Sequence, residues 1–228
     1  MNIAPHPALI VQKLQIGRER APLLVIDNLV DNAEELIELA ASKVFSDVVS
    51  HYPGIRAKVP LSYQQFVLQN LRGQFAEYFG LHTSLRFKAC HFSLVTMPPE
   101  KLAPLQRIPH IDSAAGNEIA FIHYVFKAAH GGTSFYRHRK TGYEVISPAR
   151  KAEYFASVEA ESHGPNKPPL EYINGDTPLY EEVVRHEGLF NRMLVYRGNS
   201  LHSACLGRDF VADPNPRTGR LSINGFLL

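Results

Sequence analysis

His110 and Asp112 are separated by one residue, so their side chains point to the same side of an extended chain. An imidazole nitrogen and a carboxylate oxygen both bind divalent iron. One further histidine would complete two histidines and a carboxylate on one face of the metal, leaving the other positions open for O2 and a co-substrate. His202, which ends an apolar segment beginning at Leu194, can supply that ligand. These residues therefore indicate a non-haem Fe(II) site formed by His110, Asp112 and His202.

A single His-x-Asp pair is weak evidence, because the chain contains 11 histidines and 22 acidic residues. Taken alone, His110 reads as a loop histidine and Asp112 as a turn residue. Further along the chain, Arg220 and Ser222 lie two residues apart and would share one face of a strand. Their guanidinium and hydroxyl groups are suited to bind a carboxylate. The order of these pieces along the chain is what favours a single site.

Composition sets limits on the class of protein. The chain has 228 residues, 45% hydrophobic and 20% charged, which is typical of one ordinary globular domain. The net charge of +2 and the lack of a basic run do not suggest a nucleic-acid partner. Two cysteines, Cys90 and Cys205, argue against a secreted disulfide scaffold. No apolar stretch is long enough to span a membrane, and the first residues do not resemble a signal peptide, so we expect a cytoplasmic protein.

The first third of the chain is predicted to be mainly helical after a strand at 22–27. A helix should begin near Asp31, which could cap its first turn, and a second should run from Ser62 to Phe79 and end at Gly80. Residues 49–61 are predicted to be loop, because they contain Pro53-Gly54 and Pro60.

The texture changes to strands from Leu85 onward. Residues 148–188 are rich in proline and charge, and are interpreted as an insertion over the core with short helices near 150–160 and 177–187. Helices followed by many short strands predict an α+β protein with a β-sandwich or barrel core. We expect one domain over 1–228, with a helical buttress at about 28–80 and a β core at about 85–228. The predicted strands are 85–95, 119–126, 133–137, 189–198 and 220–228.

Five motifs occur in a meaningful order: Pro109-His110-Ile111-Asp112, Tyr124-Val125, Gly131-Gly132-Thr133-Ser134-Phe135, an apolar strand running into His202, and Arg220-Leu221-Ser222. Each is degenerate alone, but the ordered set resembles the Fe(II)/2-oxoglutarate-dependent dioxygenases, especially their prolyl 4-hydroxylase-like branch. The helices of the first third also look like those that buttress the barrel of this family.

The resemblance implies a double-stranded β-helix, the cupin-like jelly roll, with iron at its mouth. His110, Asp112 and His202 would be the iron ligands. Arg220 would hold the distal carboxylate of 2-oxoglutarate, with Ser222 and Tyr124 as further contacts. The cofactors would be Fe(II) and 2-oxoglutarate as co-substrate, with ascorbate added in vitro.

Two features depart from the family pattern. The span from His202 to Arg220 is longer than usual, which leaves Arg197, Arg208 or Arg217 as alternatives for the cofactor arginine. The strand near Cys90 to Met97 lacks the tyrosine that the family often has there, and His91 or Ser93 could occupy its place.

The function expected from the resemblance is hydroxylation of a small molecule or of an amino-acid or peptide side chain. Halogenating relatives lack the carboxylate ligand, so Asp112 favours hydroxylation or a related oxidation. Two alternatives stay open. One is a non-enzymatic jelly-roll protein that binds a metal or small molecule, or assists another enzyme. The other is an iron oxygenase that does not use 2-oxoglutarate. The sequence determines neither the substrate nor the oligomeric state.

Overall fold

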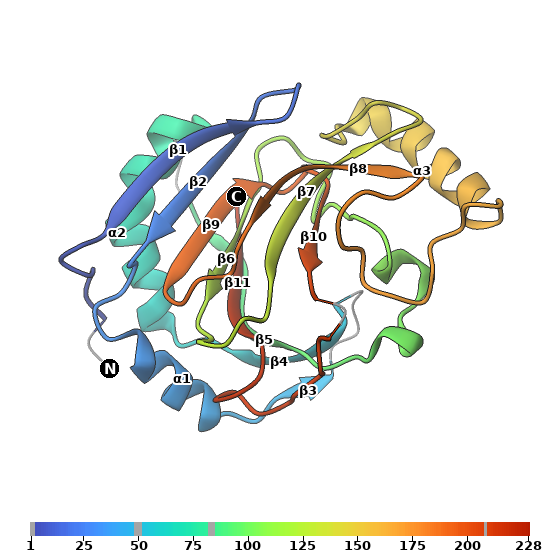
Figure 1. Cartoon of the computed structure of the whole chain (residues 1–228). Helices are drawn as coiled ribbons and strands as arrows, with labels where there is room; N and C mark the ends of the chain where they lie inside the picture. Colours follow the sequence, from blue (N-terminus) through green and yellow to red (C-terminus); the bar gives the residue numbers. More distant parts are fainter. Residues whose placement is uncertain (1–2, 48–51, 82–84, 208) are drawn as a thin grey trace.

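The chain forms two antiparallel sheets with helices on the outside (Figure 1). The structure is a computed structural model that describes residues 3–47, 52–81, 85–207 and 209–228. In these residues the strands are β1 (Ile10–Ile16), β2 (Ala21–Asp27), β3 (Ser46–Asp47), β4 (Gly54–Lys58), β5 (Phe87–Val95), β6 (Ile119–Tyr124), β7 (Gly132–His138), β8 (Tyr180–His186), β9 (Arg192–Arg197), β10 (His202–Cys205) and β11 (Leu221–Leu227). The α-helices are α1 (Ala33–Ala41), α2 (Leu61–Phe79) and α3 (Pro148–Ser162), and the 3-10 turns are η1 (Pro99–Lys101) and η2 (Pro104–Gln106).

The larger sheet has the strand order β1-β2-β9-β6-β11-β5-β4-β3, and the smaller has the order β10-β7-β8. Strands that are neighbours in space are often distant in sequence. For example, β11 lies between β5 and β6, and β9 lies between β2 and β6. These antiparallel sheets together with the helices confirm the predicted α+β class.

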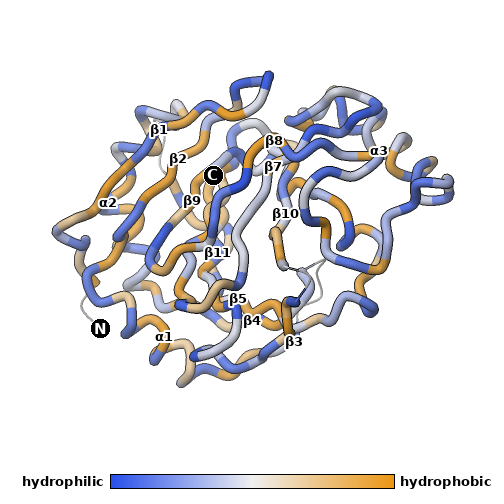
Figure 2. Tube along the Cα trace, viewed as in Figure 1, coloured by the Kyte–Doolittle hydropathy of each residue, from blue (hydrophilic) through white to orange (hydrophobic). Residues whose placement is uncertain are grey.

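One face of the larger sheet packs against α1 and α2, which lie together on one side of it in Figure 1. The predicted apolar stripe of α2 is buried there: Phe66, Val67, Leu71, Phe75 and Phe79. Alternate residues of the strands complete this layer, as along β2, which is mostly orange in Figure 2. Burying this stripe supplies most of the stability of the helix, because an isolated amphipathic helix is marginal in water.

The opposite face of the larger sheet looks toward the smaller sheet. Leu23 and Val25 of β2 pack there with Phe135 of β7, whereas Leu24 and Ile26 belong to the helix-covered face. This period of two assigns each strand one set of residues for the helical layer and another for the interior. Part of the interior is filled by side chains, and part is open.

The helix ends agree only in part with the sequence prediction. Gly80 ends α2 in the left-handed conformation (φ 65°), which glycine adopts without a steric penalty, so this prediction is confirmed. The prediction that Asp31 caps the first turn of the helix is wrong. Asn32 is the residue before α1, and no side chain caps the helix.

Two further predictions are wrong. The segment 49–61 was expected to be loop, but its described part contains β4, which pairs with β5. The segment 177–187 was expected to be helical, but it contains β8, which pairs with β7. Charged residues favour a helix there. In the fold, however, Val184 lies opposite Phe135, and pairing with β7 outweighs the local preference.

The predicted helix near 150–160 is confirmed as α3. Its Tyr154 and Val158 pack on Ile108, Tyr136 and Tyr180, so the helix covers one end of the interior. The boundaries predicted for the helical buttress, the β core and the insertion stay predictions. No helix in the described ranges is long and apolar enough to cross a membrane.

His123 of β6 connects the sheet to the helical layer through a hydrogen bond to Tyr63 of α2. Its Nδ1 lies 2.9 Å from the Tyr63 hydroxyl, and its Nε2 lies 3.2 Å from Asn191 Oδ1. Both bonds are satisfied by the neutral ring, in which Nε2–H donates to Asn191 and Nδ1 accepts from Tyr63. Burial lowers the pKa of His123 to about 4, an effect that the hydrogen bond to Asn191 opposes. His123 is therefore a neutral core histidine and does not face the interior cavity.

This burial predicts a loss of stability in mild acid. The unfolded chain takes up the His123 proton near the ordinary pKa of 6.5, whereas the folded protein takes it up only near pH 4, so stability falls as the pH drops between these values. From pH 7 to pH 5 the loss should be about 2 kcal/mol. Urea unfolding of His123→Gln at both pH values should show a smaller loss than the wild type, with the exposed His163→Gln as control. An equal loss in all three proteins would contradict this assignment.

Candidate metal centre and cavity

Backbone pairing brings the two predicted histidine ligands together. His110 N donates to His202 O at 2.9 Å, and His202 N donates to His110 O at 3.0 Å, so the two residues form an isolated antiparallel bridge. Residues directly opposite in such a pair project their side chains to the same face. The two imidazole centroids are accordingly 4.3 Å apart.

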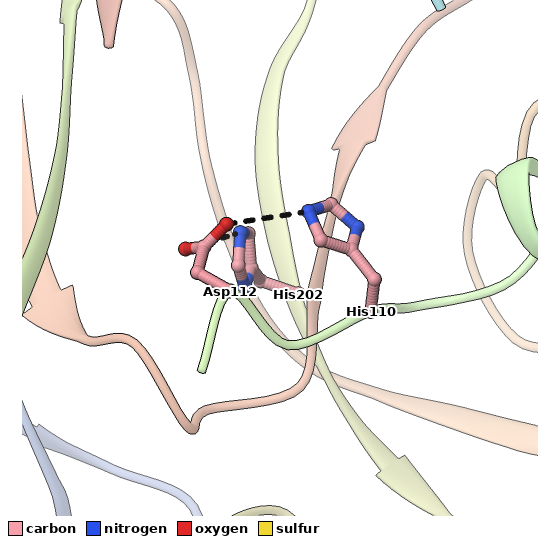
Figure 3. A group of neighbouring side chains, drawn as sticks. All are labelled: His110, Asp112 and His202. Carbon is pink, nitrogen blue, oxygen red and sulfur yellow. Dashed lines mark ion pairs between the residues drawn. The ribbon is translucent and has the colours of Figure 1, made fainter. Parts of the chain in front are cut away.

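A second backbone contact holds Asp112 beside this pair. Asp112 N donates to Gly198 O at 2.8 Å, in the turn that connects β9 to β10. Its carboxylate lies 3.8 Å from His110 Nε2 and 3.5 Å from His202 Nε2, and Figure 3 marks both contacts with dashed lines. The three donor groups lie within 4.8 Å of one another. The structure therefore brings together all three residues that the sequence nominated as ligands.

The protonation states of His202 and Asp112 follow from burial. The His202 side chain is buried and its Nδ1 lies 2.9 Å from Ser200 O, so Nδ1–H donates there and Nε2 keeps its lone pair. Burial lowers the pKa of His202 to about 4, which leaves the ring neutral at pH 7. Asp112 as a whole residue is exposed, but its side chain is only 15% exposed. Burial raises the pKa of its carboxyl to about 6, although positive charge at His110 and Arg56 acts in the opposite direction.

These donors fit divalent iron. A neutral imidazole, a carboxylate that ionises near neutral pH and a second imidazole at the mouth are the donor types of the two-histidine, one-carboxylate arrangement. A divalent cation would also offset the cost of holding the Asp112 carboxylate out of water.

The triad lies in the wall of a cavity of 440 Å³ between the two sheets. Such a volume is in the range of small-molecule sites. Two arginines, Arg56 and Arg220, line the cavity. Its lining also includes apolar and aromatic residues before and within α3, such as Leu105, Ile108, Tyr154 and Phe155.

Arg220 is the predicted cofactor arginine, and it lies in this cavity with only 2% of its surface exposed. Its Nε donates to His130 O at 3.0 Å, and one terminal nitrogen donates to Gly132 O at 2.7 Å. The rings of Tyr124 and Phe126 flank the guanidinium at 5.8 and 5.6 Å. Among the described residues it has no carboxylate partner. A buried cation of this kind favours an anionic ligand.

Ser222 and Tyr124 lie behind the cavity wall. Ser222 Oγ donates to Asn224 Oδ1 at 2.8 Å, and the Tyr124 hydroxyl lies 2.7 Å from Thr133 Oγ1. Asn224 and Thr133 are the residues that line the cavity at these points. The cofactor contacts predicted for Ser222 and Tyr124 stay predictions.

The alternative cofactor arginines are engaged elsewhere. Arg197 donates to Gly116 O and Phe79 O, and Arg217 pairs with Glu38 of α1 on the surface. Arg208 lies outside the described residues. The described residues 209–219 before Arg220 form no helix or strand, and Arg217 lies among them. Of the predicted candidates in the described chain, only Arg220 lines the cavity.

The residues of the cavity wall that sequence reasoning missed include Arg56, Tyr196 and Asn224. Arg56 was hidden by the loop prediction, although Ile55, Ala57 and the intervening polar residues alternate as in a strand. Asn224 follows Ser222 by two residues and could have been found from that spacing. The Tyr196 hydroxyl lies 3.0 Å from His202 Nε2, a contact that has no sequence signal. The suggestion that His91 or Ser93 occupies the position of the family tyrosine stays a prediction.

Several solved structures have a fold similar to that of this chain. The epimerase SnoN, described as a non-heme alpha ketoglutarate dependent epimerase from nogalamycin biosynthesis, has a TM-score of 0.52 and 15% identity, over 92% of this chain and 78% of its own. HygX from Streptomyces hygroscopicus, solved with nickel and 2-oxoglutarate, has a TM-score of 0.50 and 12% identity, over 93% of this chain and 87% of its own. The fold is thus the double-stranded β-helix of the 2-oxoglutarate oxygenases, as predicted. The closer assignment to the prolyl 4-hydroxylase-like branch stays a prediction.

The chain belongs to the family described as "Family of unknown function (DUF6445)", whose model matches residues 7–227. A search of curated proteins finds no match.

The Asp112 environment predicts pH-dependent metal binding. Between pH 7 and pH 5 His202 stays largely neutral, whereas Asp112 gains a proton near its pKa of about 6, so its ionised fraction falls about tenfold. The Kd for Mn(II), measured by titration calorimetry, should therefore be at least about tenfold higher at pH 5. Asp112→Asn should bind weakly at both pH values with a flatter dependence. A wild-type affinity that does not change over this range would exclude Asp112 as a ligand.

Proposed function

We propose that this protein is an Fe(II)- and 2-oxoglutarate-dependent oxygenase that hydroxylates an organic substrate. The observation that carries the proposal is the triad: two imidazoles and one carboxylate within 4.8 Å in the wall of a cavity. The similarity to SnoN in complex with Fe3+ and alpha ketoglutarate (TM-score 0.54, 14% identity) supports the choice of metal and co-substrate.

In this proposal His110, Asp112 and His202 hold the iron. Bound iron supplies the redox chemistry that activates O2, with 2-oxoglutarate as the source of electrons. Overall, O2, 2-oxoglutarate and a C–H bond of the substrate are converted into succinate, CO2 and an alcohol. The hydrogen bond from His202 Nδ1 to Ser200 O selects the tautomer and ring orientation that ligation needs.

Arg220 is proposed to hold the distal carboxylate of 2-oxoglutarate. Its side chain is oriented by the carbonyls of His130 and Gly132, so the guanidinium requires little reordering when it binds a ligand. The carboxylate would supply the counterion that the buried guanidinium lacks among the described residues.

The apolar residues of the cavity wall are proposed to keep water away from the reaction. Ile108, Tyr154 and Phe155 limit the access of water to the reacting groups, and a drier site strengthens the charge interactions inside it.

The test is uncoupled turnover. Purified protein incubated with ferrous iron, ascorbate, 2-oxoglutarate and O2 should form succinate, quantified by mass spectrometry. Asp112→Ala should reduce the rate at least about a hundredfold, because loss of a ligand removes the metal. Arg220→Leu should raise the KM for 2-oxoglutarate at least tenfold, the cost of one charged hydrogen-bonded pair. The exposed His163→Ala serves as control.

The outcomes separate the alternatives. Wild-type protein that binds metal and 2-oxoglutarate but forms no succinate with any candidate substrate would favour a binding protein. Oxygen-dependent product without succinate, and unaffected by Arg220→Leu, would favour an oxygenase that does not use 2-oxoglutarate.

A further inference from the structure

Arg56 is a second guanidinium in the cavity, and neither the triad nor the proposed co-substrate contacts account for it. It lies on β4, where Arg56 pairs with Ser93 of β5, which in turn pairs with Ser222 of β11. Neighbouring strands are about 4.8 Å apart, so Arg56 is about 10 Å from β11 across the sheet. Arg56 and Arg220 therefore both line the cavity but stand at separate positions along it.

Arg56 is poorly compensated by the protein. Its guanidinium lies over the ring of Tyr52 at 4.2 Å, and its Nε is buried without a hydrogen-bond partner among the described residues. The carboxylate whose charge acts on it is Asp112, the proposed metal ligand. Burial lowers the pKa of Arg56, which shows that its charge is held at a cost. A guanidinium with an unused buried N–H is suited to receive an acceptor from a ligand.

The charges of the loaded site leave Arg56 unbalanced. The two positive charges of Fe(II) and the one of Arg220 are matched by the single negative charge of Asp112 and the two of 2-oxoglutarate. Arg56 then contributes one positive charge that no described residue of the cavity lining balances. A ligand with one negative charge would neutralise it, and a carboxylate matches the planar guanidinium fork.

The rest of the cavity is complementary to an apolar group. Ile108 lines the wall, while Leu105 and Phe155 stand at the mouth with 44% and 39% of their surfaces exposed. Large exposed apolar side chains around a pocket are typical of a surface that a ligand covers.

From this juxtaposition we propose that Arg56 binds the carboxylate of the substrate, and that the substrate is an organic acid with an apolar or aromatic body. That this ligand is a substrate rests on the proposed function. The anion site itself is defined by Arg56, Tyr52 and the cavity.

The test compares 3-phenylpropanoate with its neutral amide. Both are titrated by calorimetry into anaerobic wild-type protein loaded with Mn(II) and 2-oxoglutarate, and again into metal-free protein. The acid should bind the loaded protein at least about tenfold more tightly than the amide, and Arg56→Gln should remove that preference. Arg56→Lys should retain part of it, because the charge remains but the fork is lost. Arg217→Gln, a surface arginine, should retain all of it.

Two comparisons make the result specific. Arg56→Gln should weaken the acid far more than it weakens 2-oxoglutarate, and Arg220→Gln should show the opposite order. Equal binding of acid and amide by the wild type, or wild-type affinity for the acid in Arg56→Gln, overturns the proposal. Inorganic phosphate that competes more strongly than the acid, in an Arg56-dependent manner, also overturns it. Thermal melts of each variant identify loss of fold, and Arg56→Lys then carries the test.

The two proposals can fail separately. A protein that forms no succinate but distinguishes acid from amide through Arg56, with or without metal, contradicts the oxygenase assignment and supports the anion site. Succinate production without any acid preference contradicts the anion site alone.

Discussion

The reciprocal backbone hydrogen bonds between His110 and His202 are the interaction on which the candidate site depends. They join a segment that precedes β6 to the start of β10, and they project both imidazoles to the same face. The bond from Asp112 N to Gly198 O adds the carboxylate to the same unit. Because the main chain makes these contacts, the backbone that carries the three donors is positioned before any metal binds. Less conformational freedom then remains to be lost on binding, which favours affinity.

The two faces of the larger sheet have different roles: one packs against the helices, and the other lines the cavity of the candidate site. The face covered by α1 and α2 is apolar, and the buried His123 is satisfied there by Tyr63 and Asn191. On the other face, Arg56 and Arg220 line a cavity with few anionic neighbours. Holding such cations out of water costs folding energy unless a ligand supplies the counter-charge. Function therefore accounts for the two arginines in this cavity better than stability does.

Similarity of fold leaves the chemistry to be argued from the site. SnoN and HygX are 15% and 12% identical to this chain, and one fold can host many reactions. What distinguishes this protein lies in its own cavity. Tyr196 donates toward a proposed ligand, Arg56 adds a second positive charge, and α3 forms an apolar wall.

Sequence alone determined the donor types, their order along the chain, and the elements with strong periodicity, such as α2 and its end at Gly80. These features are local: ligand chemistry, side-chain period and the backbone freedom of glycine are properties of a residue and its near neighbours. The sequence reading failed for β4 and β8, because a short strand is stabilised by the strand beside it, here β5 and β7, more than by its own composition. Only the tertiary structure decided that Arg56, Tyr196 and the triad share one cavity. Pairing between distant strands sets which residues meet, and that register is a property of the whole sheet.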